Sequence, residues 1–314
     1  MIALFPKPRV LTPQIERLPR SVWMTIAAGF RADGGVVLCA DTQETIPDYL
    51  KTQTSKIALF EKNEEFRIAM TGAGGSDMID MIYQTIIGKF MENRAYDYAT
   101  VEQTIRDVVY ETETKHVLPY PREERPSFHL VIALQVKGER VRLLKTVDTT
   151  VRHEDNFTCA GDVALAYYAA GRLDFSQMPV CFARSYAIYM LQQVKAYSPT
   201  CGKQTEVLVL YDDWDIENLS DEFIQTEEFH IARINALTRH LLANSFAHRA
   251  QSESLQEDLE HLKRHIEEYR EWEMSQSDEH CKLRNELFTK EKMIRVGQHG
   301  LREGYTARQK RVAG

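Results

Sequence analysis

The sequence predicts a mixed fold of strands and helices, an α/β sandwich followed by a helical extension. Apolar runs of strand length alternate with segments whose apolar residues recur every three or four positions, which is the periodicity of helices. Several strand-like runs are apolar at consecutive positions, as expected of strands that are buried on both faces. Beyond residue 213 the chain is charged and contains no proline, which favours long helices.

The most informative stretch is residues 25–43. Two short apolar runs, Thr25–Phe30 and Val36–Ala40, are joined by Asp33-Gly34-Gly35. Asp-Gly between such runs predicts a hairpin, because glycine readily adopts the positive φ that the turn requires. A hairpin brings the start of its first strand beside the end of its second. We therefore expect the hydroxyl of Thr25 to lie close to the carboxylate of Asp41.

The middle of the chain predicts two groups of helices separated by strands. The order is strands, two helices, strands, two helices and a final strand. The expected strands after the hairpin are 57–60, 66–71, 128–136, 140–147 and 206–211, and the expected helices are 77–90, 101–115, 163–173 and 180–196.

Length and charge exclude some classes of protein. The 314 residues suffice for one large domain with an appendage, or for two domains. The net charge of −7, with a basic stretch only at the C-terminal tip, argues against nucleic-acid binding. No apolar run approaches the ~20 residues of a membrane span, and the N-terminus lacks the apolar core of a secretory signal. We therefore expect a cytoplasmic protein without membrane or nucleic-acid partners.

The cysteines show no paired spacing, so neither a disulfide framework nor a metal site is predicted. We expect reduced thiols that act mainly as small buried side chains. They are Cys39, Cys159, Cys181, Cys201 and Cys281.

Residues 1–24 contain four prolines and predict an extended arm rather than a helix. Three interpretations remain open. The arm is a pro-segment that is removed before Thr25, or translation starts at Met24 and removal of that methionine exposes Thr25, or the arm stays attached and packs over the site. Self-cleavage before Thr25 needs a strained turn, which the bulky Met24 should resist.

The segment 214–314 predicts helices with a short apolar seam. Leu255, Leu259, Leu262, Ile266 and Tyr269 follow a four-three-four-three spacing, with charges between them. About two heptads are too few to specify an independent coiled coil. The segment is therefore either an amphipathic helix that packs on its own core or an arm that contacts a neighbouring subunit.

Several motifs occur in a specific order. After Ala40-Asp41-Thr42 comes Lys56-Ile57 ahead of a strand, and then Thr71-Gly72-Ala73-Gly74-Gly75 ahead of a helix. From about Thr25 to Asp212 this order resembles the proteasome β-type subunits and their bacterial ATP-dependent protease relative, which are N-terminal nucleophile hydrolases. The resemblance implies an α+β fold, a four-layer α-β-β-α sandwich. It also implies the domains 1–24 (arm or pro-segment), 25–213 (hydrolase) and 214–314 (helical extension), without cofactor or metal.

The resemblance also implies a catalytic site. Thr25 would be the nucleophile, with its own free α-amine as the base, because an α-amine titrates near ~8 and a threonine hydroxyl needs a base. Lys56 would lie beside the hydroxyl, and Asp41 would orient Lys56. The backbone N–H of Gly72 would bind the oxyanion, and Ser198 would accept a hydrogen bond from the amine.

Two departures from the family pattern weaken the groups around the amine. Ala160 stands where a hydroxyl is usual, and Ser198 and Cys201 stand where the family carries Asp and Ser. Losing groups that orient a reactive one lowers activity. Glu44 and Met70 are expected to flank the cleft and bind substrate.

The resemblance favours a threonine-type endopeptidase that acts on peptides or unfolded proteins. It would assemble as a ring-like or helical homo-oligomer, through outer helices such as 74–90, and could be supplied by an unfoldase ATPase. The alternative is a catalytically silent, proteasome-like scaffold subunit that assembles without hydrolysing peptides.

Overall fold

The structure is a computed structural model that describes residues 25–46, 50–92, 97–171, 173–246 and 252–286. The arm, residues 1–24, and the basic C-terminal tip lie outside the described residues. Expectations about them therefore stay predictions.

The first sheet has five antiparallel strands in the order β10-β1-β2-β11-β12. The hairpin predicted around Gly34 forms its centre, and Gly34 has the expected positive φ of 92°. The strands are β1 (Ile26–Ala32), β2 (Gly35–Asp41), β10 (Phe157–Gly161), β11 (Thr205–Tyr211) and β12 (Ile216–Asn218).

The second sheet also has five antiparallel strands, in the order β5-β6-β7-β8-β9. A separate two-stranded ribbon follows β2. The strands of the second sheet are β5 (Ala58–Lys62), β6 (Phe66–Gly74), β7 (Phe128–Val136), β8 (Arg142–Val147) and β9 (Thr150–Glu154), and those of the ribbon are β3 (Gln43–Ile46) and β4 (Leu50–Gln53).

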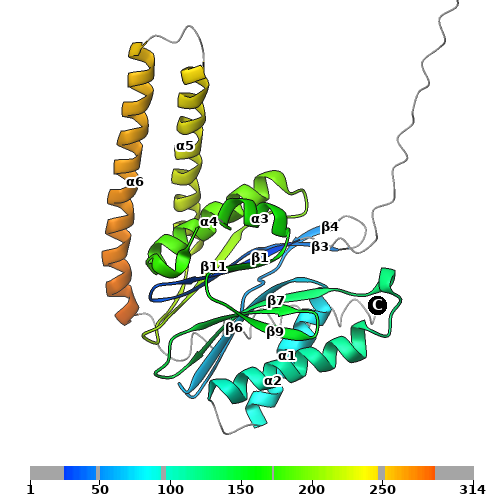
Figure 1. Cartoon of the computed structure of the whole chain (residues 1–314). Helices are drawn as coiled ribbons and strands as arrows, with labels where there is room; N and C mark the ends of the chain where they lie inside the picture. Colours follow the sequence, from blue (N-terminus) through cyan, green and yellow to red (C-terminus); the bar gives the residue numbers. More distant parts are fainter. Residues whose placement is uncertain (1–24, 47–49, 93–96, 172, 247–251, 287–314) are drawn as a thin grey trace, which may run out of the picture.

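The two sheets face each other across a shared apolar core, and helices cover their other faces (Figure 1). Leu38 of β2 and Leu143 of β8 belong to the core between the sheets. Beside the second sheet lie α1 (Ser76–Glu92) and α2 (Tyr98–Thr112), and beside the first lie α3 (Val163–Ala170) and α4 (Val180–Tyr197). A short π-helix, η1 (Glu113–Val117), and two 3-10 helices, η2 (Arg122–Glu124) and η3 (Phe175–Gln177), lie in the connections.

The predicted mixture of helices and antiparallel sheets is confirmed, and β7 has the predicted bounds. Strands β3, β4, β9, β10 and β12 were not predicted from the sequence. Short strands of this kind carry weak signals: β9, Thr-Val-Arg-His-Glu, has one buried side chain among five residues. The strand β12 pairs with β11, so the first sheet continues beyond Asp213.

Two long helices follow, α5 (Asp221–Phe246) and α6 (Ser252–Glu286). The first turns of α5 contribute Phe223, Ile224 and Ile231 to the core beside α4. The predicted seam of α6 is correct in part. Leu255, Leu262 and Tyr269 are partly buried, but Leu259 and Ile266 are exposed. The seam that faces α5 instead runs through Leu255, Asp258, Leu262, His265, Tyr269 and Trp272.

No helix among the described residues is both long and apolar enough to cross a membrane. Cys39, Cys159 and Cys201 are buried free thiols, whereas Cys181 is exposed. Three of the five cysteines therefore pack as the sequence predicted.

Candidate active site

Thr25, Asp41 and Lys56 meet where the two sheets come together. Thr25 directly precedes β1, and Asp41 is the last residue of β2, the neighbouring antiparallel strand. Lys56 lies two residues before β5, the first strand of the second sheet. The hairpin and the entry into the second sheet thus supply a hydroxyl, a carboxylate and an ammonium to one place.

The hydroxyl of Thr25 lies between the two charged groups. It donates a hydrogen bond to Oδ1 of Asp41 and accepts one from Nζ of Lys56. Nζ of Lys56 also donates to Oδ1 of Asp41 at 2.9 Å and to the carbonyl of Gln43 at 2.5 Å. Ion pairing of Lys56 with Asp41 keeps the ammonium against the threonine oxygen, where positive charge favours the alkoxide.

Asp41 is fully buried, with an exposed fraction of 0%. Besides Thr25 and Lys56, two backbone amides donate to it: N–H of Ile26 to Oδ1 at 3.1 Å and N–H of Gly202 to Oδ2 at 2.9 Å. A buried carboxylate is stable only when such donors and a cation compensate its lost hydration. Its four donors come from three separate places in the chain, residues 25–26, Lys56 and Gly202, so Asp41 fixes their relative positions.

Glu206, at the start of β11, holds the backbone that carries Lys56. The amide of Lys56 donates to Oε2 of Glu206 at 2.8 Å. Burial raises the pKa of Glu206 above its ordinary value, and the hydrogen bond from the Lys56 amide acts in the opposite direction. This role of Glu206 was not predicted from the sequence. Its only signal is a lone carboxylate in an otherwise apolar strand, Thr-Glu-Val-Leu-Val-Leu-Tyr.

The backbone of Thr25 is held by the end of β10. The amide of Asp162 donates to the carbonyl of Thr25 at 3.1 Å. Gly161 precedes it with a φ of +95°, and a Cβ at this position would lie 1.6 Å from that carbonyl oxygen. Only glycine allows this close approach. This role of Gly161 was not predicted from the sequence.

Ser198 lies in the loop between α4 and β11 that touches Asp41 through Gly202. Its hydroxyl pairs with the hydroxyl of Thr200 at 2.9 Å, and the side-chain amide of Gln43 donates to the carbonyl of Thr200. Burial raises the pKa of the nearby Cys201 thiol to about 11, so this thiol is neutral at physiological pH. The loop is thus part of the wall of the site.

Gly72 lies in β6 opposite Leu130 of β7. The amide of Leu130 points away from Gly72 and toward β8, because it donates to the hydroxyl of Thr146 in β8 at 2.8 Å. Directly opposed residues of an antiparallel pair bond to each other in both directions or in neither. The amide of Gly72 therefore points away from β7, toward the edge where β5 begins only at Ala58. Continuing the β5–β6 register places Lys56 across from Gly72.

The two residues that were predicted to bind substrate, Glu44 and Met70, have different surroundings. Oε2 of Glu44 accepts a hydrogen bond from the hydroxyl of Thr54 at 3.0 Å. Met70 is buried in the core that includes residues of α1 and α2. A substrate role for Glu44 and Met70 stays a prediction.

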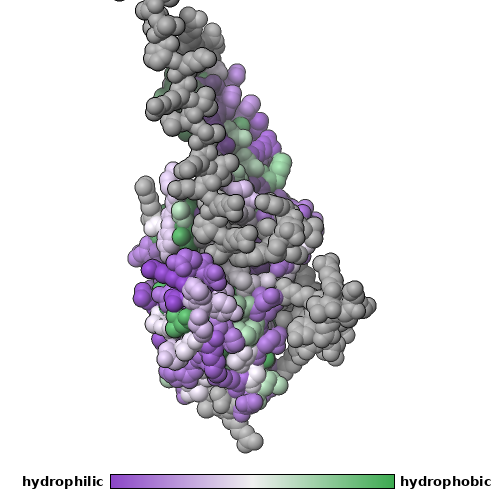
Figure 2. Space-filling model, turned by 90° about the vertical axis from the view of Figure 1, so that its right-hand side faces the viewer, coloured by the Kyte–Doolittle hydropathy of each residue, from purple (hydrophilic) through white to green (hydrophobic). Residues whose placement is uncertain are grey.

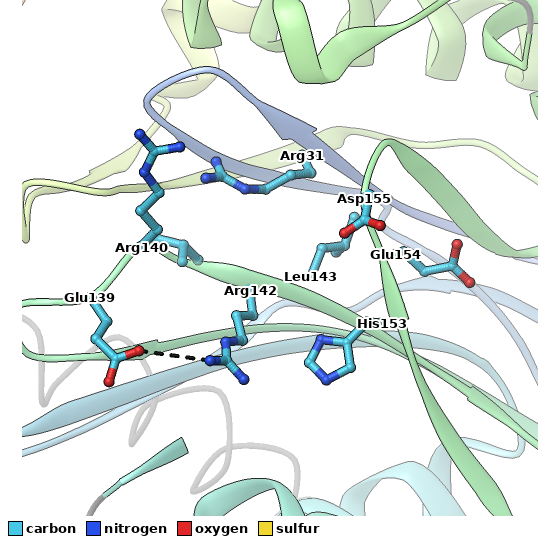
Figure 3. Close-up of a pocket in the computed structure, with 9 residues that line it drawn as sticks. Arg31, Glu139, Arg140, Arg142, Leu143, His153, Glu154 and Asp155 are labelled. Carbon is cyan, nitrogen blue, oxygen red and sulfur yellow. Dashed lines mark ion pairs between the residues drawn. The ribbon is translucent and has the colours of Figure 1, made fainter. Parts of the chain in front are cut away.

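A cavity of about 380 Å³ lies at the far end of β1 from Thr25 (Figure 3). Some charged side chains that line the cavity form ion pairs. Arg142 pairs with Glu139, which also lines the cavity, and Arg31 pairs with Asp212, which does not. Thr25, Asp41 and Lys56 do not contribute to it. Among the described residues, no group of three or more His, Cys, Asp or Glu side chains is arranged to hold a metal ion.

No family model matches the sequence, and no curated protein matches it. Solved structures do. Anbu from Hyphomicrobium sp. strain MC1 superposes with a TM-score of 0.58 at 18% identity, covering 72% of this chain and 100% of that one. Anbu (ancestral beta-subunit) from Yersinia bercovieri gives 0.58 at 12% identity, covering 67% and 93%. A helical assembly of the Anbu complex from Pseudomonas aeruginosa gives 0.55 at 13% identity, covering 69% and 96%.

These structures correct the resemblance drawn from the sequence. The three structures are Anbu proteins, a proteasome-like family, so a close likeness to proteasome β-type subunits or to the bacterial ATP-dependent protease subunit is not shown. The motifs were not sufficient to identify the family. They correspond to the hairpin and to the residues around Asp41, which are features of the fold and do not distinguish one family within it. At these identities the likeness establishes the fold alone.

The contact between Gly161 and Thr25 gives a direct prediction. Gly161→Ala should destabilise the protein by about 3 kcal/mol or more, because its Cβ would overlap the Thr25 carbonyl. Gly34→Ala is the matched control: Gly34 also has a positive φ, but nothing lies within 4 Å of its Cβ position. It should cost about 1–2 kcal/mol, from backbone strain only. Urea unfolding of both variants tests this, and equal losses would contradict the close approach.

Proposed function

We propose that this chain is a self-assembling subunit with the proteasome-like fold of the Anbu proteins. The observation that carries this proposal is the match over nearly the whole length of those chains, one of which was solved as a helical assembly. We infer that the succession of helices, sheet, sheet and helices is the four-layer α-β-β-α sandwich of the N-terminal nucleophile type. Two sheets that share a core, with helices beside their outer faces, support this inference.

The outer helices support assembly. On α3 and α4 the aromatic side chains of Tyr167, Tyr168, Phe182 and Tyr197 are exposed, Tyr168 by 82%. Exposed aromatic side chains on outer helices are available for protein–protein contact. The face shown in Figure 2 also carries apolar side chains (green) among polar ones (purple). The helix α1, which overlaps the segment 74–90, remains a candidate contact as well.

A second function, threonine-type amide hydrolysis, is favoured by one specific observation. The Thr25 hydroxyl lies between the carboxylate of Asp41 and the ammonium of Lys56. In this mechanism Oγ1 of Thr25 attacks the amide carbon, and its proton passes to the free α-amine of the same residue. The oxyanion is stabilised by the Gly72 amide. The amine then protonates the leaving nitrogen, and water hydrolyses the resulting ester of Thr25.

Hydrolysis and silent assembly differ in the state of the Thr25 nitrogen. A chain that keeps residues 1–24 has an amide there, which cannot act as a base. With Thr25 as the first residue, peptides or unfolded proteins are the proposed substrates, and an unfoldase ATPase is a proposed partner. Glu44 and Met70 are proposed to bind substrate, and Ser198 is proposed to accept a hydrogen bond from the amine. We propose the cytoplasm as the location.

We also keep the domain division as a proposal: residues 1–24 as an arm, 25–213 as the core and 214–314 as a helical extension. Two features support a tighter link between the last two parts. Strand β12 pairs with β11, and Phe223 and Ile224 of α5 belong to the core beside α4.

Assembly predicts a large particle. Sedimentation velocity of the full chain at micromolar concentration should show a mass several times the monomer mass of 36.3 kDa. Apolar contacts between outer helices should make the particle persist in high salt, because salt screens charges and not apolar contacts. A single monomeric species at these concentrations would contradict the proposal.

The proposed hydrolysis predicts how much activity each of three variants loses. Intact mass first identifies preparations that begin at Thr25. In these, Thr25→Ala should abolish labelling by a threonine-directed epoxyketone and hydrolysis of fluorogenic peptides. Lys56→Ala should lower hydrolysis at least about 100-fold, because it removes the cation beside the nucleophile. The control Lys137→Ala, whose side chain is 62% exposed, should leave the rate unchanged.

Three results would decide against hydrolysis as the function. They are unchanged labelling of Thr25→Ala, equal mild losses for the two lysine variants, and a wild-type chain that begins at Thr25 and is inert toward the probe. The last result would leave the silent subunit as the function.

A further inference from the structure

The helices α5 and α6 form an antiparallel hairpin that projects beyond α3 and α4 (Figure 1). Two hydrogen bonds set its register near the tip. His240 and Asn244 of α5 both pair with Asp258 of α6, at 3.1 Å and 2.7 Å. The inward side chains of α5, Ile234, Leu237 and Leu241, are partly buried. Each helix of the hairpin covers only the face of its partner that points toward it. The faces of α5 and α6 that point away from each other are not covered by the hairpin.

The outward face of α5 is apolar apart from one arginine. Ala232, Ala236, Arg239, Ala243 and Phe246 recur at three- and four-residue spacing and are exposed, and Leu242 is exposed beside them. Leu242 is 50% exposed and Phe246 is 80% exposed. Small residues between larger apolar ones allow another helix to approach closely. This face has the composition of a helix-packing surface.

The outward face of α6 carries more acidic than basic side chains. Gln256, Glu260, Lys263, Glu267 and Glu271 recur at similar spacing and are exposed. The register places Glu260 at the level of Arg239, because Asp258 pairs with His240. Arg239 and Glu260 therefore lie at the same level along the hairpin axis but on its two opposite outer faces, and their charges have opposite sign.

The charges are also separated along the sequence of the tip. From Phe229 to Phe246, α5 has two arginines and no carboxylate. From Ser252 to Leu262, α6 has four carboxylates and neither lysine nor arginine. Packing two α5 faces together would oppose Arg239 to itself, and packing two α6 faces would oppose Glu260 to itself. Only α5 against α6 pairs unlike charges.

We propose that the outward face of α5 in one copy packs against the outward face of α6 in the next copy. The contact joins two different surfaces, so it repeats from subunit to subunit and generates a ring or a helix. It rests on the self-assembly proposed above and names the surface and the partner. Leu242 and Phe246 supply apolar burial, and Arg239 pairs with Glu260 of the next copy.

Charge reversal tests this contact. Arg239→Glu and Glu260→Arg should each weaken association about tenfold at low salt, because each opposes like charges. The double variant on one chain should restore it. An equimolar mixture of the two single variants should also restore it, because alternating copies then oppose unlike charges at every contact. Arg122→Glu changes the net charge equally at an exposed position elsewhere, and should have no effect.

An apolar variant gives an independent readout. Phe246→Ser should weaken association about tenfold at low and at high salt, with an unchanged circular dichroism spectrum because Phe246 is exposed. Wild-type protein that assembles, with variants that assemble equally well, would overturn this contact and leave the proposed assembly standing. Variants that are weakened but not restored on mixing would also overturn it, since the face would then serve another partner or another segment of this chain. A monomeric wild type would overturn both proposals.

Discussion

The buried carboxylate of Asp41 is the constraint on which the site depends. Removing a carboxylate from water costs several kcal/mol unless a cation and hydrogen-bond donors replace its hydration. Here the replacements are the Lys56 ammonium, the Thr25 hydroxyl and the amides of Ile26 and Gly202. They arrive from the start of β1, from the approach to the second sheet and from the loop before β11. Satisfying one carboxylate therefore draws these segments together and fixes the position of the hydroxyl.

Two further contacts keep the donors in place. Glu206 accepts from the Lys56 amide, so the lysine is anchored by its backbone as well as by its ammonium. Gly161 lets β10 approach Thr25, so that Asp162 can donate to the threonine carbonyl. Both contacts act on the backbone. They hold Thr25, the residue before β1, and Lys56 in place although neither residue belongs to a strand.

The parts of the fold that could be predicted from the sequence have local causes. Asp33-Gly34-Gly35 specifies its hairpin because the turn needs positive φ, and the hairpin alone predicts that Thr25 and Asp41 are neighbours. The run 128–136 is apolar at seven of its nine positions, so β7 was predicted with its bounds. Glu206, Gly161 and Gly202 escaped prediction because their roles come from contacts with residues more than 100 positions away. The seam of α6 was misplaced because Asp258 and His265 face α5, where polar side chains find partners across the hairpin.

The most direct test of the central claim is a double-mutant cycle on the free energy of unfolding. Asp41→Asn and Lys56→Met each leave a charge without its partner, and each should cost about 3–5 kcal/mol. The double variant removes both charges, so it should cost less than the sum by about 2 kcal/mol. Losses that simply add would mean that Asp41 and Lys56 act independently, and would contradict the claim that the carboxylate organises the site.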